Sequence, residues 1–328
     1  PLTLELTGEV NVAALAAAFN DVKLRHETLR TIFPSEQGRP YQQVLPHSNV
    51  QLERLDFSQS SIDQLPQKLQ QFADEQAHQA FDLEHGPLLR VCLIKAADNE
   101  HHLVVTLHHI VTEGWAMDIF ARELAVLYEA FLKGHESPLA PLTVQYLDYS
   151  VWQRQWLESG EMQRQLNYWR EQLGGEQPLL ELPTDYPRPA EQSYRGDLLR
   201  FELDAELSAA VRRFNIEHGL TLSMTATAAL ALLLYRYSGQ NDLRIGIPVA
   251  NRIRPESEGL IGAFLNTQVL RIQPDAHMHG MELLEQVRRV SIEAQSHQDV
   301  PFDQLVDALQ PQRSAAWNPL FQVMCNVQ

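Results

Sequence analysis

The sequence predicts an α/β protein of two lobes, and three features lead to this expectation. The chain has 328 residues, of which 44% are hydrophobic, which is more than one small core needs. Strand-like apolar runs alternate with helical patterns in both halves of the chain. Between Gly174 and Arg195 that alternation stops, and four prolines interrupt a polar stretch. We therefore predict an N-terminal lobe at residues 1–175, a linker at 176–194 and a C-terminal lobe at 195–328.

The predicted N-terminal lobe opens with a strand followed by a helix. Residues 1–9 have a strand-like pattern, and apolar residues then recur at three- and four-residue spacing over 12–22, which is typical of an amphipathic helix. Residues 88–95 and 103–110 are apolar runs rich in β-branched residues, which suit a buried sheet. Residues 117–131 again trace one helical face.

The same alternation resumes in the predicted C-terminal lobe. We expect a strand at residues 198–203, a helix at 205–218, and a buried helix that ends near Gly239. Two further strands are expected at 243–248 and 263–272. We find no internal repeat or low-complexity segment.

The charge and hydropathy of the chain exclude several classes of partner. The formal net charge is −16 with acidic residues spread along the sequence, which argues against binding to nucleic acid or to an anionic membrane. The best candidate for a membrane span, residues 222–235, is interrupted by polar residues and is shorter than the roughly 20 residues that a bilayer requires. No signal peptide is visible, and the chain starts at Pro1 as a fragment would.

The cysteines and the absent motifs narrow the chemistry further. Cys92 and Cys325 lie far apart in apolar, strand-like contexts, which predicts reduced thiols in a cytoplasmic protein. The sequence lacks a Gly-rich phosphate loop, a Cys-x-x-Cys pair and a Gly-x-Ser-x-Gly turn, which excludes the usual nucleotide, zinc and serine-hydrolase sites.

The candidate catalytic residues lie where a Val-rich strand leads into a helix. Successive side chains on a strand point to opposite faces, so His108 and His109 cannot both face one cavity if the strand is regular. Glu113 and Gly114 fall at the start of the next helix, where free N–H groups favour developing negative charge. A neutral imidazole there could assist a proton transfer near neutral pH.

Two other interpretations of these histidines remain open on the residues alone. A pair of histidines in a strand is often structural, and Trp115 could equally be a core aromatic residue. Metal binding is the other alternative, because His101, His102 and Glu113 lie close to the pair in the sequence. Strand alternation separates the histidines of each pair, however, and no standard zinc spacing is present.

Six segments resemble, in order, the core motifs of condensation domains from nonribosomal peptide synthetases. The stretch from His108 to Trp115 resembles the family's His-His-x-x-x-Asp-Gly motif, with Glu113 in place of the Asp. The remaining five matches are residues 25–33, 146–152, 261–271, 297–303 and 313–320. The family's first motif would precede Pro1 and its last section would follow Gln328, so the resemblance implies a piece trimmed at both ends.

The resemblance implies a fold and a set of site residues. It implies two lobes like chloramphenicol acetyltransferase, arranged in a V around a central tunnel. His109 would face the acceptor amine, His108 would pack beside it, and Gly114 would lie near the thioester carbonyl with Trp115 next to it. Glu113 would form an ion pair with Arg252 of the other lobe.

Other motif residues would support the fold rather than the chemistry. Arg25, Arg30 and Asp148 are expected to be scaffold charges, because arginine forks commonly hold loops together. Asn266 and the Pro301-Phe302 turn are expected to line the tunnel.

The implied reaction is amide-bond formation between two carrier-bound thioesters. The donor would sit on an upstream carrier protein and the acceptor amine on a downstream one, each on a phosphopantetheine arm, with an adenylation domain adjacent. No intrinsic cofactor or metal is expected, and motifs five and six resemble the subtype that takes an L-configured donor, LCL. The alternatives are a non-catalytic recruiting or gating domain and a freestanding coenzyme A-dependent acyltransferase.

Overall fold

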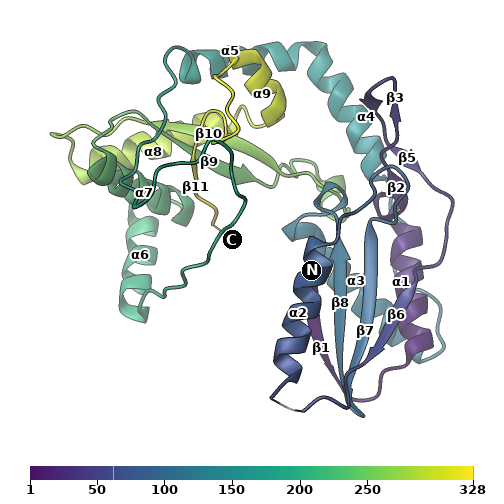
Figure 1. The fold of residues 1–328 in the computed structure, drawn as a ribbon. Coiled ribbons are helices and arrows are strands. Elements are labelled where there is room, and N and C mark those ends of the chain that lie inside the picture. Colours follow the sequence, from purple (N-terminus) through teal and green to yellow (C-terminus); the bar gives the residue numbers. More distant parts are fainter. Residues whose placement is uncertain (62, 328) are drawn as a thin grey trace. The chain divides into compact units, whose positions relative to one another are not determined.

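The structure of the protein is a computed structural model that describes residues 1–61 and 63–327 (Figure 1). Its contacts divide the chain into two compact units. The first comprises Pro1–Arg154 with Arg252–Phe264, and the second comprises Gln155–Asn251 with Leu265–Gln328. We call Arg252–Phe264 the crossover segment, because it belongs to the first unit while the chain on either side belongs to the second.

The first unit is built on a four-stranded sheet of order β1-β8-β7-β6. Strands β1 and β7 run antiparallel to β8, and β6 runs parallel to β7. In chain order the elements are β1 (Leu2–Thr7), α1 (Val12–Arg25), η1 (Glu27–Arg30), β2 (Thr31–Ile32), β3 (Ser35–Glu36), β4 (Arg39–Pro40), β5 (Gln43–Val44), β6 (Leu52–Asp56), α2 (Leu65–His78), β7 (Leu89–Ala97), β8 (Glu100–Leu107), η2 (His109–Val111), α3 (Gly114–Leu132), α4 (Tyr146–Trp156) and, in the crossover segment, η4 (Pro255–Ser257).

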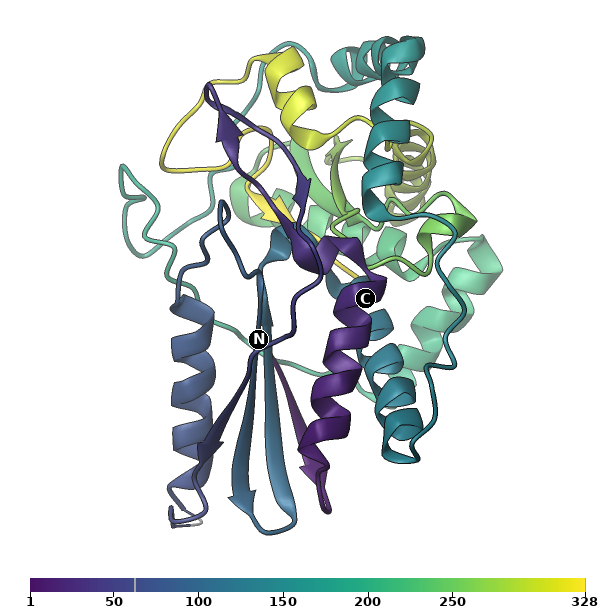
Figure 2. The same ribbon diagram turned by 90° about the vertical axis from the view of Figure 1, so that its right-hand side faces the viewer.

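Helices cover both faces of this sheet (Figures 1 and 2). On one face α1 and α3 pack against each other, with the Phe19 and Phe120 ring centroids 5.9 Å apart in the main core. On the other face α2 covers a smaller cluster that contains Cys92 and Ile94 of β7. Both faces of β7 are therefore buried, as its continuous apolar run predicts.

The second unit has a three-stranded sheet of order β10-β9-β11, with β10 antiparallel and β11 parallel to β9. Residues of α5, α7, α8 and α9 bury their apolar sides together with β9 and β10 in one core. The elements are η3 (Leu157–Glu161), α5 (Met162–Leu173), α6 (Ala205–His218), α7 (Leu222–Ser238), β9 (Leu243–Val249), β10 (Asn266–Ile272), α8 (Gly280–Gln295), α9 (Phe302–Leu309) and β11 (Val323–Met324).

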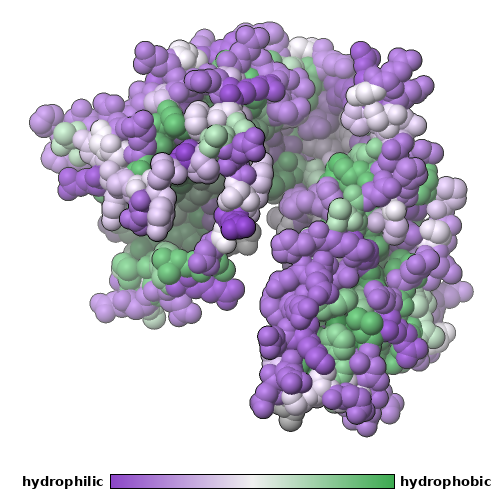
Figure 3. All heavy atoms as spheres, in the orientation of Figure 1, coloured by the Kyte–Doolittle hydropathy of each residue, from purple (hydrophilic) through white to green (hydrophobic). Residues whose placement is uncertain are grey.

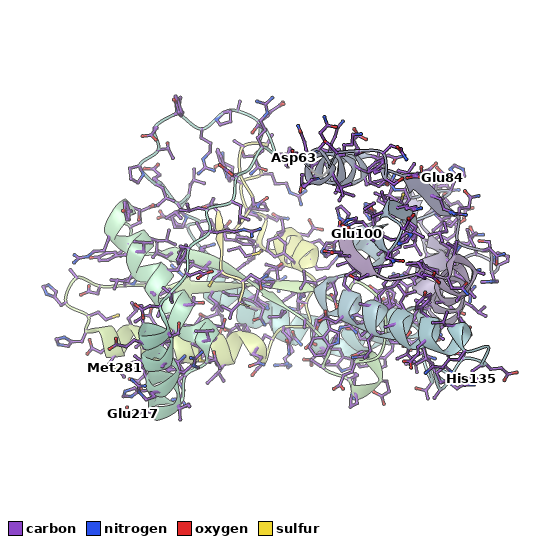
Figure 4. All side chains as sticks on the ribbon, turned by 90° about the horizontal axis from the view of Figure 1, so that it is seen from below. Asp63, Glu84, Glu100, His135, Glu217 and Met281 are labelled. Atoms are coloured by element: carbon purple, nitrogen blue, oxygen red, sulfur yellow. The ribbon has the colours of Figure 1, made fainter. Side chains whose placement is uncertain are left out.

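Helix ends in this unit follow their sequence signals. Asp204 and Thr221 cap the starts of α6 and α7 through side-chain oxygens, and Gly219 and Gly239 end these helices in the left-handed conformation. Glu217 of α6 and Met281 of α8 lie at the same end of this unit in Figure 4, where α6, α7 and α8 border a pocket of about 480 Å³.

Several predicted boundaries differ from the observed ones. The compact units do not coincide with lobes at 1–175 and 195–328, because α5 buries Leu166, Trp169 and Leu173 in the core of the second unit. The strand predicted at 103–110 ends at Leu107, and the one predicted at 263–272 begins at Asn266. Helix α7 is only partly buried, with Leu233 52% exposed.

The strand predicted at residues 198–203 is absent. This stretch has no regular structure, and Leu199 and Phe201 are 87% and 80% exposed. Within the described part of the chain no strand pairs with it, and an apolar stretch forms a strand only when a neighbour satisfies its backbone groups. Figure 3 shows apolar side chains on the surface of this unit around α6.

No single helix among the described residues is long and apolar enough to cross a membrane. Helices α6 and α7 meet that test only as a pair, and they are bent by 107° relative to each other.

Candidate active site

The two motif histidines lie beyond the end of β8, so the alternation of a regular strand does not decide their directions. His108 has an extended backbone and is the N-cap of the short helix η2, where its Nδ1 accepts the N–H of Ile110 at 3.0 Å. Its own N–H donates to the carbonyl of Leu88 at 3.1 Å. These bonds fix His108 between β7 and η2.

The structure gives the two histidines different surroundings. The ring of His108 is half-buried and lies edge-on to Phe81, with the centroids 5.7 Å apart. Burial lowers the pKa of His108, and the charge of His109 adds to this shift, so the neutral form is favoured. His109 is exposed. One imidazole is therefore packed while the other is open to solvent.

A buried ion pair stands at the start of α3. Glu113 is the N-cap residue, but its carboxylate makes no capping bond and instead accepts from Arg252. Glu113 Oε1 lies 2.9 Å from Nε and 2.8 Å from Nη2 of Arg252, and both side chains are 3% exposed. The predicted pair is thus present with Glu in place of the family's Asp, although Arg252 belongs to the same compact unit as Glu113 and not to the other lobe.

Arg252 has further contacts within the crossover segment. Its Nη1 donates to the carbonyls of Ser257 and Leu260, the latter at 2.9 Å, and its guanidinium lies 4.1 Å from the ring centroid of Phe264. Burial lowers the pKa of Arg252, and the charge of Glu113 opposes that shift. The guanidinium therefore links the start of α3 to several points of the crossover segment.

Gly114 and Trp115 form the first turn of α3. A Cβ placed on Gly114 would meet no described atom within 4 Å, and the backbone there is not left-handed. Trp115 is 52% exposed, and its indole N–H donates to the carbonyl of Glu258 at 3.2 Å. The alternative of a core aromatic residue is therefore wrong for Trp115.

The crossover segment packs closely against α4. The hydroxyl of Tyr146 donates to the carbonyl of Ala263 at 2.8 Å. A Cβ on Gly262 would lie 2.3 Å from the Tyr146 ring, so only glycine fits at that point. Ile261, beside it, is fully buried in the core of the first unit.

Two other predicted residues, Arg30 and Asp148, form hydrogen bonds with nearby backbone groups. Arg30 donates to the carbonyl of Leu45 at 2.6 Å and to the carboxylate of Glu27 at 3.1 Å. Asp148 accepts the N–H of Gln145 at 2.8 Å, which closes the first turn of α4.

Asn266 lies in the second unit and is buried. Its amide donates to the carbonyls of Gln298 and Val300, both at 2.7 Å, and accepts the N–H of Phe302 at 3.1 Å. All three bonds go to residues within 297–302, and we call this stretch the 297–302 loop. The expectation that Asn266 lines a tunnel stays a prediction.

Sequence reasoning missed two buried residues of the first unit. His26 and Glu123 are 1% and 7% exposed and are 2.7 Å apart, between Nε2 and Oε2. His26 falls within a recognised motif, but Glu123 is 97 residues away and has the position of an ordinary helix charge. No spacing rule connects them.

Cys92 and candidate metal ligands are the other side chains that bear on the chemistry of the described residues. Burial raises the pKa of Cys92 to about 12, so its thiolate is scarce at neutral pH. Across residues 1–61 and 63–327 no three His, Cys, Asp or Glu side chains are arranged to hold a metal ion.

Comparison with known sequences places the chain in a large family. A family model described as Condensation domain matches residues 1–328. Malpinin synthetase of Mortierella alpina is 45% identical over 324 residues, which cover 99% of this chain and 4% of that protein. A linear gramicidin synthase of Brevibacillus parabrevis is 43% identical over 328 residues, or 100% of this chain and 6% of the relative. The chain thus spans a small fraction of these synthetases.

Solved structures agree on the fold. The X-domain from teicoplanin biosynthesis is 33% identical, with a TM-score of 0.88 over 98% of this chain and 71% of that one. A four-domain nonribosomal peptide synthetase, holo-AB3403, is 22% identical with a TM-score of 0.87 over 100% of this chain and 24% of that one, which is a likeness of fold alone. With its mixed α/β fold and a family model that matches its whole length, this chain belongs to the condensation-domain family.

Proposed function

We propose that this domain forms an amide bond between a donor acyl or peptidyl thioester on an upstream carrier protein and the α-amine of an aminoacyl thioester on a downstream one. Family membership supports the class of reaction. The observation that carries the proposal for this chain is the exposed His109 beside the open first turn of α3, which Glu113 and Arg252 hold in place.

His109 is the proposed partner of the acceptor amine. An α-amine has a pKa of about 7.7–8.0, so a useful fraction is already neutral near physiological pH. The exposed imidazole can orient this amine and take up its proton as the bond forms, a role worth about 10²- to 10⁴-fold. His108 packs against its neighbours, and the ion pair between Glu113 and Arg252 holds the start of α3 in place.

Gly114 is the proposed point of approach for the donor thioester. Neither a left-handed backbone nor packing against described residues requires glycine there. A substrate that approaches the first turn of α3 does require it, because a side chain would project into its path. The free N–H groups of that turn can stabilise the oxyanion that develops on the thioester carbonyl. Trp115 would flank this position.

We propose direct transfer between the two thioesters. At the motif, the Thr112 hydroxyl donates to the sulfur of Met117 at 3.4 Å and bonds no imidazole among the described residues, and the Cys92 thiol is buried. An acyl-enzyme on either residue is therefore disfavoured. Phosphopantetheine arms would deliver both substrates through the predicted tunnel, and an L-configured donor fits the motif resemblance. An adjacent adenylation domain would load the downstream carrier.

The test follows transfer by intact-protein mass spectrometry, with upstream and downstream carrier proteins loaded with acyl- and aminoacyl-phosphopantetheine. His109→Ala should lower the rate by about 10² or more. Gly114→Ala should fold normally and still lower it by tenfold or more. His135→Ala, at an exposed histidine just after α3, is the matched control and should leave the rate unchanged. Equal rates for wild type and His109→Ala would refute the assignment of His109.

A recruiting role is the second candidate, and the likeness to an X-domain favours it. That relative has also been solved as a complex with OxyB, at 32% identity to this chain and a TM-score of 0.88. If the wild-type protein binds both loaded carriers but transfers nothing, the recruiting role replaces the catalytic one.

A further inference from the structure

His26 occupies a central position in the first unit. It follows the end of α1, and its imidazole is almost fully buried between α3 and the crossover segment. Nδ1 lies 3.3 Å from the backbone nitrogen of Ile261, and Nε2 lies 2.7 Å from Oε2 of Glu123. Because a backbone N–H can only donate, Nδ1 must accept, and Nε2 therefore carries the proton that is shared with Glu123.

Glu123 fixes this arrangement from the middle of α3. Its other carboxylate oxygen accepts from Nε of Arg25 at 3.1 Å. Burial alone would raise the pKa of Glu123, but the hydrogen bond from His26, together with the charge and hydrogen bond of Arg25, lowers it overall. The carboxylate is thus ionised and holds His26 in one tautomer.

The same peptide group that binds His26 also binds Arg252. The N–H of Ile261 and the carbonyl of Leu260 belong to one planar peptide unit. The N–H donates to His26, while the carbonyl accepts from Nη1 of Arg252 at 2.9 Å. Arg252 in turn pairs with Glu113 at the N-terminus of α3. The contacts therefore form a closed network that begins and ends on α3, at Glu113 and Glu123.

We propose that His26 and Glu123 are positioning residues for the candidate active site. They hold the Leu260–Ile261 peptide, which orients Arg252, which sets the position of Glu113 and of the first turn of α3. This inference rests on the proposed function of His109 and Gly114, which that turn presents to substrate. Neither side chain needs to touch substrate.

Loss of either residue has a specific expected effect. In His26→Gln a flexible chain replaces the rigid ring, so the amide is no longer fixed where it bonds the Ile261 N–H and Glu123 at the same time. The Leu260–Ile261 peptide is then released and Arg252 gains freedom. A displacement of about 1 Å at a catalytic group can cost about 10²-fold in rate. We expect kcat to fall by about tenfold or more while KM stays within about twofold.

The experiment combines three readouts on the same proteins. Hydrogen exchange by mass spectrometry should show peptides from residues 252–264 exchanging about tenfold faster or more in His26→Gln, with peptides of β7 and of the second unit unchanged. ¹⁵N-histidine NMR of the wild type should show His26 protonated on Nε2 only, and the isosteric Glu123→Gln should keep this tautomer, because its amide oxygen can still accept from Nε2 while the Ile261 N–H still donates to Nδ1. His85→Gln, an exposed histidine paired with Asp82, is the matched control and should change nothing.

The outcomes separate this proposal from the proposed function. Faster exchange at 252–264 together with a lower kcat supports positioning. Unchanged exchange, or an Nδ1-protonated His26 in the wild type, overturns it, as does faster exchange without any loss of kcat. If the wild type transfers no acyl group, the proposed function fails and positioning for catalysis fails with it. Faster exchange at 252–264 in His26→Gln and an Nε2-protonated His26 in the wild type would still establish the closed network.

Discussion

The crossover segment and the 297–302 loop are both irregular segments held by buried side chains, but the groups that hold them differ in charge. The crossover segment depends on the Arg252–Glu113 pair and on His26 with Glu123. The 297–302 loop depends on neutral amides, those of Asn266 and of Gln165, which bonds both the backbone N–H and the carboxylate of Asp299.

This difference predicts how each segment should respond to a substitution that removes one of its side-chain partners. A buried charge that loses its partner is strongly unfavourable, whereas a lost amide leaves only neutral groups unsatisfied. The charged contacts also connect, through the Leu260–Ile261 peptide and Arg252, to Glu113 at the start of α3, so a substitution there should affect the candidate active site. Damage to the 297–302 loop should destabilise the second unit first.

The largest effect is expected from Arg252→Met. It leaves the Glu113 carboxylate buried at 3% exposure without its ion-pair partner, and such a loss costs about 3–5 kcal/mol. Pulse hydrogen exchange during urea unfolding measures the stability of each unit separately, and peptides of the first unit should unfold at lower urea.

The double variant Glu113→Leu with Arg252→Met is the control for this prediction. It removes both charges, so most of the lost stability should return, because apolar replacements for a buried ion pair are often neutral. Transfer activity should stay low. If the single variant is as stable as the wild type, the pair does not hold the crossover segment.

Asn266→Ala should give the next largest effect, in the second unit. It leaves two carbonyls and one N–H of the 297–302 loop without partners, at a cost of about 3 kcal/mol in the free energy of unfolding. The same exchange measurement should show the loss in peptides of α9 and β10 and not in the crossover segment. An equal loss in both units would contradict the separation of the two networks.

Gly262→Ala should have a smaller effect and act by crowding. The new methyl group would lie 2.3 Å from the Tyr146 ring, and overpacking of this kind costs about 1–3 kcal/mol. Gly259→Ala, in the same segment but with no atom within 4 Å of its Cβ, is the matched control and should be neutral. Equal stability of the two variants would mean that Tyr146 moves freely.

Local periodicity predicted most helices and the main strands of this protein, since α1, α3, α6 and β9 follow apolar spacing that their own residues set. The prediction of a strand at residues 198–203 was wrong, because a strand depends on a partner strand that local sequence does not specify. The resemblance to the family proposed His109 and Gly114 as site residues and predicted the ion pair between Glu113 and Arg252, which the structure contains. It could not reveal Glu123, because the pairing with His26 depends on how α1 and α3 pack.

The smallest effect, and one of opposite sign, is expected from Asp299→Asn. Burial raises the pKa of Asp299, and the hydrogen bond from Gln165 only partly offsets this. A carboxyl group whose pKa is higher in the folded state destabilises the fold above that pKa, and the penalty disappears as pH falls below the unfolded value of about 3.9.

Asn keeps an oxygen that can accept from Gln165 and carries no charge. Asp299→Asn should therefore stabilise the second unit by about 0.5–1 kcal/mol at pH 7.5, a typical gain for relieving an unfavourable charge, and by much less at pH 3.5. Urea midpoints of second-unit peptides at both pH values measure this, and a loss of stability at pH 7.5 would mean that the carboxylate bond to Gln165 outweighs the cost of burial.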